Sequence, residues 1–271
     1  MKIFAIRDDS DPDRRDLAYL LYYESSKAFY IEITDHMTEW DVPLILSSFV
    51  KRGVYTVNAY WSKVWVQQRI VPTDRQNLGQ ILADNGLEEY DEFQLLMLAN
   101  GRCAQDDCYL ARIDSHTMEY RLKKRFQKKV DDVLPLEDLT ALLFFRDGTI
   151  RKCDFTDFFQ ANLSFGPLLT HREAFGSVTV QPGGYGIAWN DCTVISDEML
   201  YTMGTPIPLS LKDFCTFADR NLISSAEAAQ ILGCTRQNID DLIRRGKLHP
   251  VKNLPKNKLF LRSEIEARTW G

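Results

Sequence analysis

The fold of the C-terminal region is decided by one stretch, SSAEAAQILGCTRQNIDDLIRRG, which runs from Ser224 to Gly246. Ser224 can cap a helix, and Glu227 three residues later completes a capping box. Gly233 ends that helix after two turns, because a residue without a Cβ atom readily adopts the left-handed conformation. Thr235 is placed to cap a second helix. The stretch therefore predicts two short helices joined by a tight turn, which is a helix-turn-helix.

The second helix places apolar residues at helical spacing, with Ile239, Leu242 and Ile243 on its inner face. An ordinary helical hairpin would have a similar inner face, so the outer face distinguishes the two. Polar side chains that pair with base edges crowd the N-terminus of the helix: Thr235, Arg236, Gln237 and Asn238. Arginine pairs with guanine, and asparagine or glutamine with adenine. This composition favours a DNA-reading helix over a plain hairpin.

A basic segment follows the second helix. We predict that its cations grip the phosphate backbone, and they are Arg244, Arg245, Lys247, Lys252, Lys256 and Lys258. Residues 249–261 read as two short strands around a tip rich in lysine and asparagine, a β wing. Ser263 and Glu266 predict a second capping box and a final short helix to Trp270.

Residues 224–267 resemble the winged-helix domain of the MerR and phage-excisionase group. The resemblance is carried by Ala228–Gly233, Thr235–Gln237, Ile243–Leu248 and Phe260–Ile265. It implies that the second helix enters the major groove and that the wing contacts phosphate or the minor groove. MerR activators continue into a long dimerisation helix, whereas this sequence stops at Gly271, so a homodimer would need an upstream surface.

The charge distribution agrees with this assignment. From Arg220 onward the sequence holds ten Lys or Arg and five Asp or Glu, a net charge of +5. The preceding residues carry a net charge of −10 within the overall −5. A basic segment attached to an acidic body is typical of proteins that contact phosphates.

Length and composition predict a multidomain globular protein. At 271 residues and 45% hydrophobic, the chain can bury more than one core. Its longest apolar runs, Leu17–Tyr23 and Leu139–Phe145, are too short to span a bilayer, and Met1–Ser10 has no signal-peptide apolar region. Six cysteines without a disulfide framework predict free thiols in a reducing cytoplasm.

Residues 1–128 predict an N-terminal α+β domain. We expect strands at Lys2–Ile6, Leu17–Tyr23, Ala28–Ile33 and Trp61–Ile70. A capping box at Thr73–Gln76 predicts a helix ending at Asn85-Gly86, and a second helix runs from Glu89 to Asn100-Gly101. The segment from Arg69 to Arg102 resembles the N-terminal subdomain of HipA-type toxin kinases. It has no Gly-rich phosphate loop and no catalytic Asp motif, so the resemblance implies no catalytic residue.

Three other clusters in this region have a structural interpretation. Residues Asp9–Asp13 space carboxylates like a calcium loop, but Arg14 replaces the required glycine, which favours a solvated acidic loop. Cys103, Cys108 and His116 do not match a structural zinc spacing. The basic run from Arg121 to Lys129 favours a solvated helix, with contact to the DNA backbone as the alternative.

Residues 129–206 predict a small β-rich α+β domain. Strands at Leu139–Arg146 and Thr149–Cys153 flank Asp147-Gly148, a strong hairpin signal, and Pro182-Gly183-Gly184 predicts a second hairpin turn. No Lys-Ser/Thr and no helix follow these glycines, so they do not form a phosphate-binding loop. The segments Phe145–Asp154, Pro167-Leu168, Phe175–Trp189 and Leu200-Tyr201 resemble a bacterial domain of unknown function associated with toxin–antitoxin loci.

We therefore predict an α+β multidomain protein with two small modules and a winged helix-turn-helix at residues 218–271. The hypothesis is a cytoplasmic, sequence-specific transcriptional regulator that binds double-stranded DNA, with an antitoxin-like autorepressor as one version. The alternative is an adaptor that binds a toxin or another protein without DNA. No catalytic motif, metal site, cofactor or membrane contact is predicted; an enzyme built on the N-terminal module would require a cluster of perturbed ionisable groups in a pocket.

Overall fold

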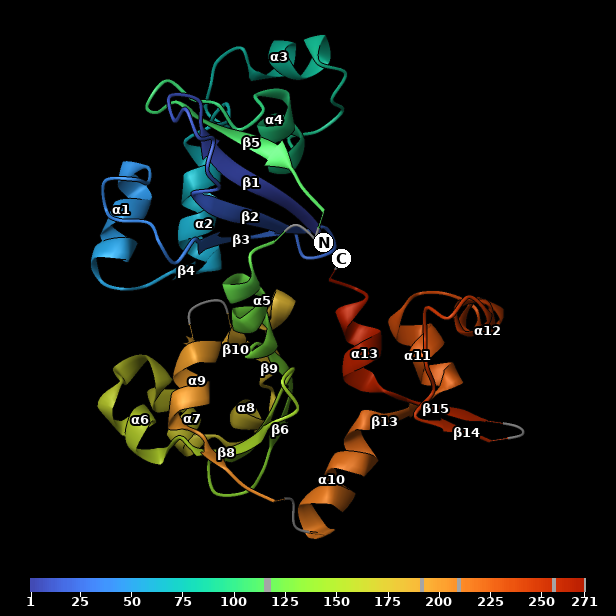
Figure 1. The fold of residues 1–271 in the computed structure, drawn as a ribbon. Helices are drawn as coiled ribbons and strands as arrows, with labels where there is room; N and C mark the ends of the chain where they lie inside the picture. The colour runs from blue at the N-terminus through green and yellow to red at the C-terminus, as the bar shows by residue number, and fades with distance from the viewer. Residues whose placement is uncertain (115–117, 191–192, 209–210, 255–256, 271) are drawn as a thin grey trace. The chain divides into compact units, whose positions relative to one another are not determined.

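The computed structural model describes residues 1–114, 118–190, 193–208, 211–254 and 257–270. The chain forms two compact units, Met1–Lys123 and Lys124–Trp270, and the boundary falls inside helix α5 (Tyr120–Gln127). Each unit mixes helices with antiparallel sheets (Figure 1), so the expected α+β architecture is confirmed. The division into three domains stays a prediction.

The first unit is built on a five-stranded antiparallel sheet in the order β4-β3-β2-β1-β5. Its strands are β1 (Lys2–Asp8), β2 (Ala18–Tyr23), β3 (Ala28–Ile33), β4 (Thr56–Val57) and β5 (Cys108–Arg112). Its helices are α1 (Leu44–Lys51), α2 (Ala59–Gln67), α3 (Leu78–Asp84) and α4 (Glu92–Leu98). The first three predicted strands are confirmed.

The core of this unit lies between the sheet and helices α2 and α4. Trp65 and Leu96 are fully buried there against Leu20 and Ile31 of the central strands. Tyr22 stacks on Phe93 with ring centroids 4.2 Å apart. The aromatic and aliphatic pairs fix the position of α4 on the sheet.

The strand predicted at Trp61–Ile70 is wrong, because these residues form most of α2. The Asn58 side chain accepts a hydrogen bond from the Trp61 N–H at 3.0 Å and starts a helix one turn earlier. Ser62, Trp65 and Val66 are the buried positions, which is a helical spacing. The helical period therefore prevailed over the aromatic and β-branched composition.

The helix starts predicted downstream are also displaced. Helix α3 begins after Asn77, so no capping box forms at Thr73–Gln76. Helix α4 begins after Asp91, whose side chain accepts from the Gln94 N–H at 2.9 Å. The predicted ends hold, since Gly86 and Gly101 both take positive φ.

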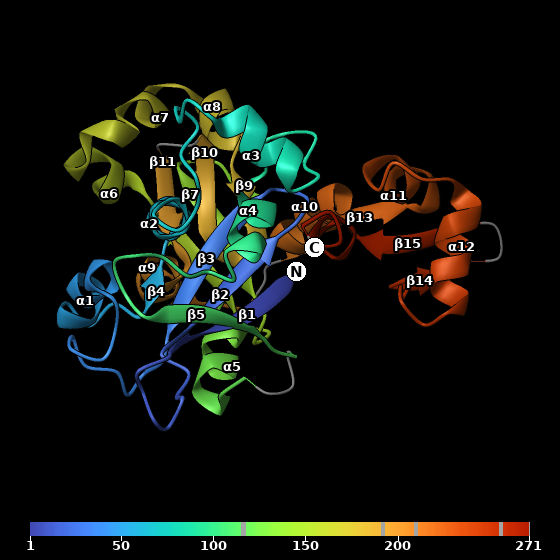
Figure 2. The same ribbon diagram turned by 90° about the horizontal axis from the view of Figure 1, so that it is seen from above.

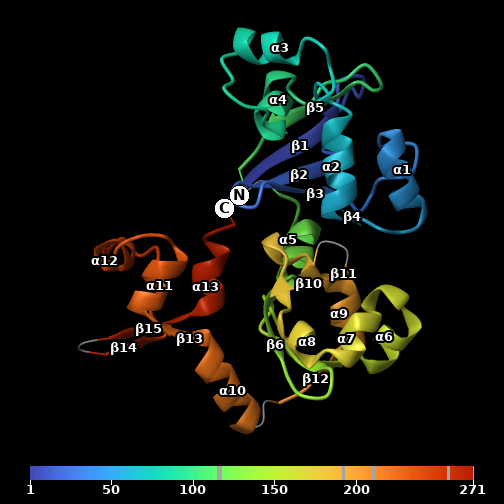
Figure 3. The same cartoon turned by 180° about the vertical axis from the view of Figure 1, so that it is seen from behind.

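The second unit begins with a β-rich part that holds two small antiparallel sheets, seen from behind in Figure 3. One has the order β12-β8-β7-β6 and the other β11-β10-β9. The strands are β6 (Val130–Pro135), β7 (Thr140–Phe145), β8 (Ile150–Asp154), β9 (Thr179–Val180), β10 (Gly186–Asn190), β11 (Thr193–Ser196) and β12 (Thr205–Pro206). The helices are α6 (Thr156–Ala161), η2 (Leu163–Phe165), α7 (Gly166–Thr170), α8 (Arg172–Gly176), η3 (Pro182–Gly184) and α9 (Asp197–Met203). Both predicted hairpins are confirmed.

The basic run that we expected on a solvated helix is not uniformly exposed. Lys129 is buried, with its side chain only 1% exposed. Its Nζ lies 3.1 Å from Asp197 Oδ2 and 3.8 Å from the centre of the Tyr185 ring. This lysine therefore belongs to the structural core of the second unit, and the prediction of a solvated residue is wrong for it.

Asp132 on β6 makes the stability of the second unit depend on pH. Burial raises the pKa of this carboxyl to about 7, and the hydrogen bond from the Val133 N–H partly opposes the shift. Between about pH 4 and pH 7 the Asp132 carboxyl is protonated in the folded state, whereas in the unfolded chain it has its ordinary pKa near 3.8 and is ionised. The free energy of unfolding therefore falls as the pH rises through this range.

We expect Asp132→Asn to be more stable than the original chain by about 2 kcal/mol at pH 8 and equally stable at pH 4. Urea unfolding at pH 4, 6 and 8 measures the difference. Asp157→Asn is the control, because Asp157 of the same unit is exposed on α6. A difference between Asp132→Asn and the original chain that stays constant across this range would contradict the prediction.

The helix-turn-helix module completes the second unit, after helix α10 (Leu211–Asn221). A three-stranded sheet in the order β13-β15-β14 supports its helices. The elements are β13 (Leu222–Ser224), α11 (Ser225–Ile231), α12 (Arg236–Arg244), β14 (Lys252–Asn253), β15 (Lys258–Leu261) and α13 (Arg262–Ala267). Its core is formed by Ile223, Ala228, Ile239, Leu248 and Phe260 with their neighbours. The predicted winged helix-turn-helix is confirmed as a fold.

One detail of this module differs from expectation. Helix α13 starts directly after β15, with Leu261 at its N-cap and no side-chain cap. Ser263 is a buried residue inside the helix, so the predicted Ser263–Glu266 capping box is wrong. The strand pairing of Leu261 with Leu222 sets the start of the helix in place of a polar cap.

The remaining structural expectations concern cysteines, metals and the membrane. Five cysteines are free, and Cys192 lies outside the described residues. Among the described residues there is no cluster of three metal-ligating side chains. His116, considered above with Cys103 and Cys108 as a zinc ligand, lies outside the described residues. The Asp11 carboxylate accepts from the Asp13 N–H and pairs with Arg15, as expected for a loop. No described helix is long and apolar enough to cross a membrane.

Candidate nucleic-acid interface

Helix α12 is positioned by a capped helix and a glycine turn. Both halves of the Ser224–Glu227 capping box form at the start of α11, and the two hydrogen bonds from Ser224 lower the pKa of the Glu227 carboxyl. Gly233 takes φ +61° in the turn. The Thr235 hydroxyl accepts from the Asn238 N–H at 3.3 Å and caps α12. Ile239 then inserts into the core with no exposed surface.

The first turn of α12 points polar side chains at solvent. Arg236, Gln237 and Asn238 are all exposed. Within the part of the chain that the structure describes, their side chains form no hydrogen bond or ion pair. Thr235 beside them is exposed but uses its hydroxyl as the helix cap. The three following side chains are therefore free to bind an external ligand.

The cations after this turn differ in whether they form ion pairs within the chain. Arg245 and Lys247 are exposed. Arg244 is 77% exposed, and its Nη1 lies 2.9 Å from Asp241 Oδ1. A salt bridge this exposed is weak, so Arg244 can leave it for another anion.

The wing, formed by β14 and β15 and seen from above in Figure 2, carries further cations. Lys252 is exposed on β14, whereas Lys258 on β15 forms an ion pair with Asp240 of α12. Lys256 lies outside the described residues. The Lys258–Asp240 pair joins the wing to the middle of the helix.

Sequence reasoning missed the two carboxylates of α12. Asp240 and Asp241 stand in the middle of the helix and each holds one of the predicted DNA-contacting cations. The signal was present, because Asp241 and Arg244 are three residues apart and pair on one helix face. Only the pairing of Asp240 with Lys258, 18 residues away, required the structure.

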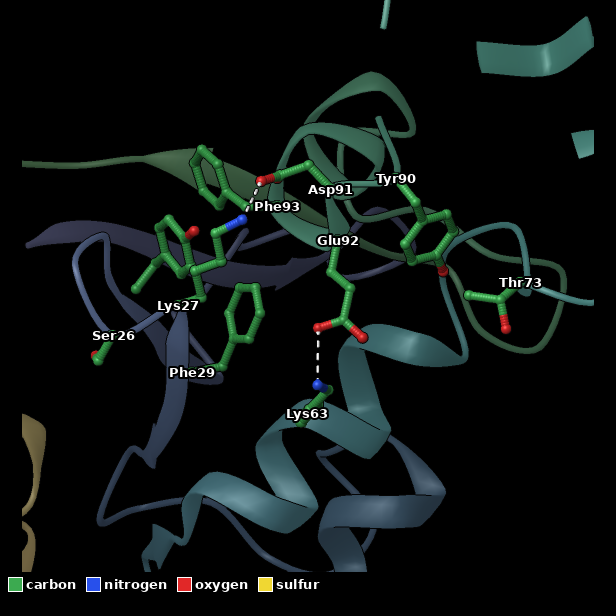
Figure 4. Close-up of a pocket in the computed structure, with 10 residues that line it drawn as sticks. Ser26, Lys27, Phe29, Lys63, Thr73, Tyr90, Asp91, Glu92 and Phe93 are labelled. Carbon is green, nitrogen blue, oxygen red and sulfur yellow. Dashed lines mark ion pairs between the residues drawn. The ribbon is translucent and has the colours of Figure 1, made fainter. Parts of the chain in front are cut away.

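A pocket in the first unit is the place where an enzymatic site would be sought (Figure 4). Its volume is about 390 Å³, and two ion pairs cross it, Lys27–Asp91 at 3.6 Å and Lys63–Glu92 at 3.3 Å. Burial raises the pKa values of the Tyr22 and Tyr90 phenols. Each of the two carboxylates in this pocket is paired with a lysine.

Two family models match parts of the chain. The helix-turn-helix domain matches residues 222–270, and the protein family of unknown function DUF2442 matches residues 130–205. The chain therefore carries a C-terminal helix-turn-helix domain, which agrees with the excisionase-type resemblance, and a central domain of that family. Helix-turn-helix domains in DNA-binding proteins place their second helix in the major groove. The MerR and HipA resemblances stay predictions.

Comparison with solved structures returned the protein NE0471 from Nitrosomonas europaea, named as a candidate DNA-binding protein. The two chains are 22% identical over 45% of this chain and 79% of that one, with a TM-score of 0.26. A score this low does not establish a shared fold. No curated protein matches the chain.

Proposed function

We propose that this protein is a sequence-specific DNA-binding transcriptional regulator. The exposed first turn of α12 carries the proposal, because Arg236, Gln237 and Asn238 lie where a recognition helix contacts base edges. In the proposal, Arg244, Arg245, Lys247, Lys252, Lys256 and Lys258 contact phosphates and set the position of the duplex. Lys258 and Arg244 exchange their carboxylate partners for phosphate on binding.

Arg236→Ala tests the base-reading role. We expect the affinity for a duplex selected from a random pool to fall by about 1–3 kcal/mol, because a guanine contact is lost. Affinity for random duplex should change much less. Fluorescence anisotropy with both duplexes measures this. Arg75→Ala is the control, since Arg75 is an exposed arginine of the first unit. If Arg236→Ala leaves the ratio of the affinities for selected and random duplex unchanged, Arg236 does not read a base.

Lys252→Ala tests the phosphate-contacting role. We expect a similar loss of affinity for selected and random duplexes, and a decrease of about one in the slope of log K against log salt. Lys51→Ala, whose lysine is 73% exposed in the first unit, is the control and should leave the slope unchanged. A loss confined to the selected duplex would instead indicate that Lys252 reads bases.

The finer parts of the proposal concern partners. We propose an antitoxin-like autorepressor in the cytoplasm, supported by the resemblance of the central domain to a toxin–antitoxin-associated family. A homodimer would place two recognition helices on half-sites about 34 Å apart. The proposal assigns the chain no catalytic activity and no cofactor. Binding of the chain to its own promoter, measured with purified protein, tests the autorepressor role.

A second candidate is an adaptor that binds a toxin or another protein and not DNA. It is favoured by the ion pairs of Arg244 and Lys258, because they reduce the positive charge available on α12 and the wing. The absence of any duplex binding at low salt, together with recovery of one neighbour-encoded protein in a pull-down, would select this function over the first.

A further inference from the structure

The outermost line of helix α12 is not purely basic. Ile239, Leu242 and Ile243 face the core, so the opposite side of the helix is the side presented to a ligand. With 3.6 residues per turn, the positions on that side are Gln237, Asp241 and Arg244, at spacings of four and three. A carboxylate therefore stands in the centre of the line that the proposed function directs into the major groove.

The two carboxylates of α12 have different surroundings. Asp240 lies toward the wing and is held by Lys258. Asp241 lies on the outer line, is 42% exposed, and is paired with Arg244, which belongs to the same line. The pair is exposed and therefore weak, so Asp241 can exchange Arg244 for a ligand.

A carboxylate in this position selects among bases. Phosphates repel it, and so do the acceptors N7 and O6 of guanine and O4 of thymine. Cytosine presents its N4 amino group to the major groove and no acceptor beside it. A carboxylate can therefore accept a hydrogen bond from cytosine without repulsion from the same base. Adenine offers an amino group beside the acceptor N7, which suits an amide better than a carboxylate.

We propose that Asp241 is a specificity-determining residue that accepts a hydrogen bond from the N4 amino group of a cytosine in the operator. On binding, Arg244 leaves Asp241 for phosphate and frees the carboxylate for the base, whereas Asp240 lies toward the wing beside Lys258. This inference rests on the proposed function and names the base that the middle of the recognition helix reads.

Selection of bound duplexes from a random pool by the full-length chain and its variants tests the proposal. For the original chain we expect a motif with a strongly preferred cytosine at one position of each site. For Asp241→Asn that position should change to adenine, because an amide pairs with adenine N6 and N7. Measured affinities for the cytosine and adenine versions of the site should differ by about tenfold in opposite directions for the two proteins.

Asp240→Asn is the matched control, since it removes the same charge one residue away. It should keep the motif of the original chain and raise the affinity for every duplex alike. The proposal is overturned if Asp241→Asn keeps cytosine at every position, or if both variants change the motif in the same way. An original chain that enriches no motif at all would instead contradict the proposed function itself.

Discussion

Replacing Gly184 by alanine should destabilise the second unit by roughly 2–5 kcal/mol. Gly184 has φ +77°, and a Cβ atom added there would lie 2.2 Å from the Val130 carbonyl oxygen of strand β6. The backbone of β6 cannot move aside without breaking its hydrogen bonds to β7. The alanine variant is therefore destabilised both by its positive φ and by the overlap of its Cβ atom with the Val130 oxygen. Urea unfolding of the full chain measures the loss, and amide exchange of β10 and β11 localises it.

Gly148→Ala provides the control for that measurement. Gly148 also has positive φ, +83°, but nothing lies within 4 Å of the added Cβ. Its replacement should therefore cost about 1 kcal/mol, from the backbone conformation alone. Equal losses in the two variants would show that the close approach of the 182–185 turn to β6 is not what requires glycine at 184.

The glycines of this turn also show what sequence reasoning can settle. The absence of a following Lys-Ser/Thr predicted a strand turn and not a phosphate-binding loop, and the η3 turn between β9 and β10 confirms the prediction. The reason for glycine at position 184 was not predictable. It depends on Val130, more than 50 residues earlier, which only the folded chain brings next to Gly184.

The helix-turn-helix was predicted correctly because its signals are local. The Ser224 box, the Gly233 turn and the Thr235 cap all act within four residues, so the sequence alone predicts them correctly. The strand predicted at Trp61–Ile70 failed because composition was weighed above a cap at Asn58 just outside the segment. Lys258 was predicted as a phosphate-contacting cation, and its pairing with Asp240 was not predictable, because Asp240 belongs to a different element, α12.

Breaking the buried pair of Lys129 and Asp197 should have the other large effect. Lys129→Ala leaves the Asp197 carboxylate, itself 9% exposed, without its cation, and we expect a loss of about 3–5 kcal/mol. Lys128→Ala is the matched control. Lys128 is the exposed neighbour and makes only a cation–π contact with Tyr201 at 5.0 Å, so its loss should stay below about 1 kcal/mol.

The double variant Lys129→Met with Asp197→Asn separates charge from packing. Both charges are then absent, so most of the lost stability should return, because an apolar or neutral pair of similar volume avoids the cost of one unpaired buried charge. If the double variant is as unstable as Lys129→Ala, the lysine acts through its packing on Tyr185, 3.8 Å from its Nζ, and not through the ion pair.

The affinity of these variants for DNA should follow their stability, and their base preference should not change, because Lys129 is buried and Arg236–Asn238 are exposed. A smaller salt dependence of binding to random duplex in Lys128→Ala would place the exposed part of this basic run at the DNA backbone after all.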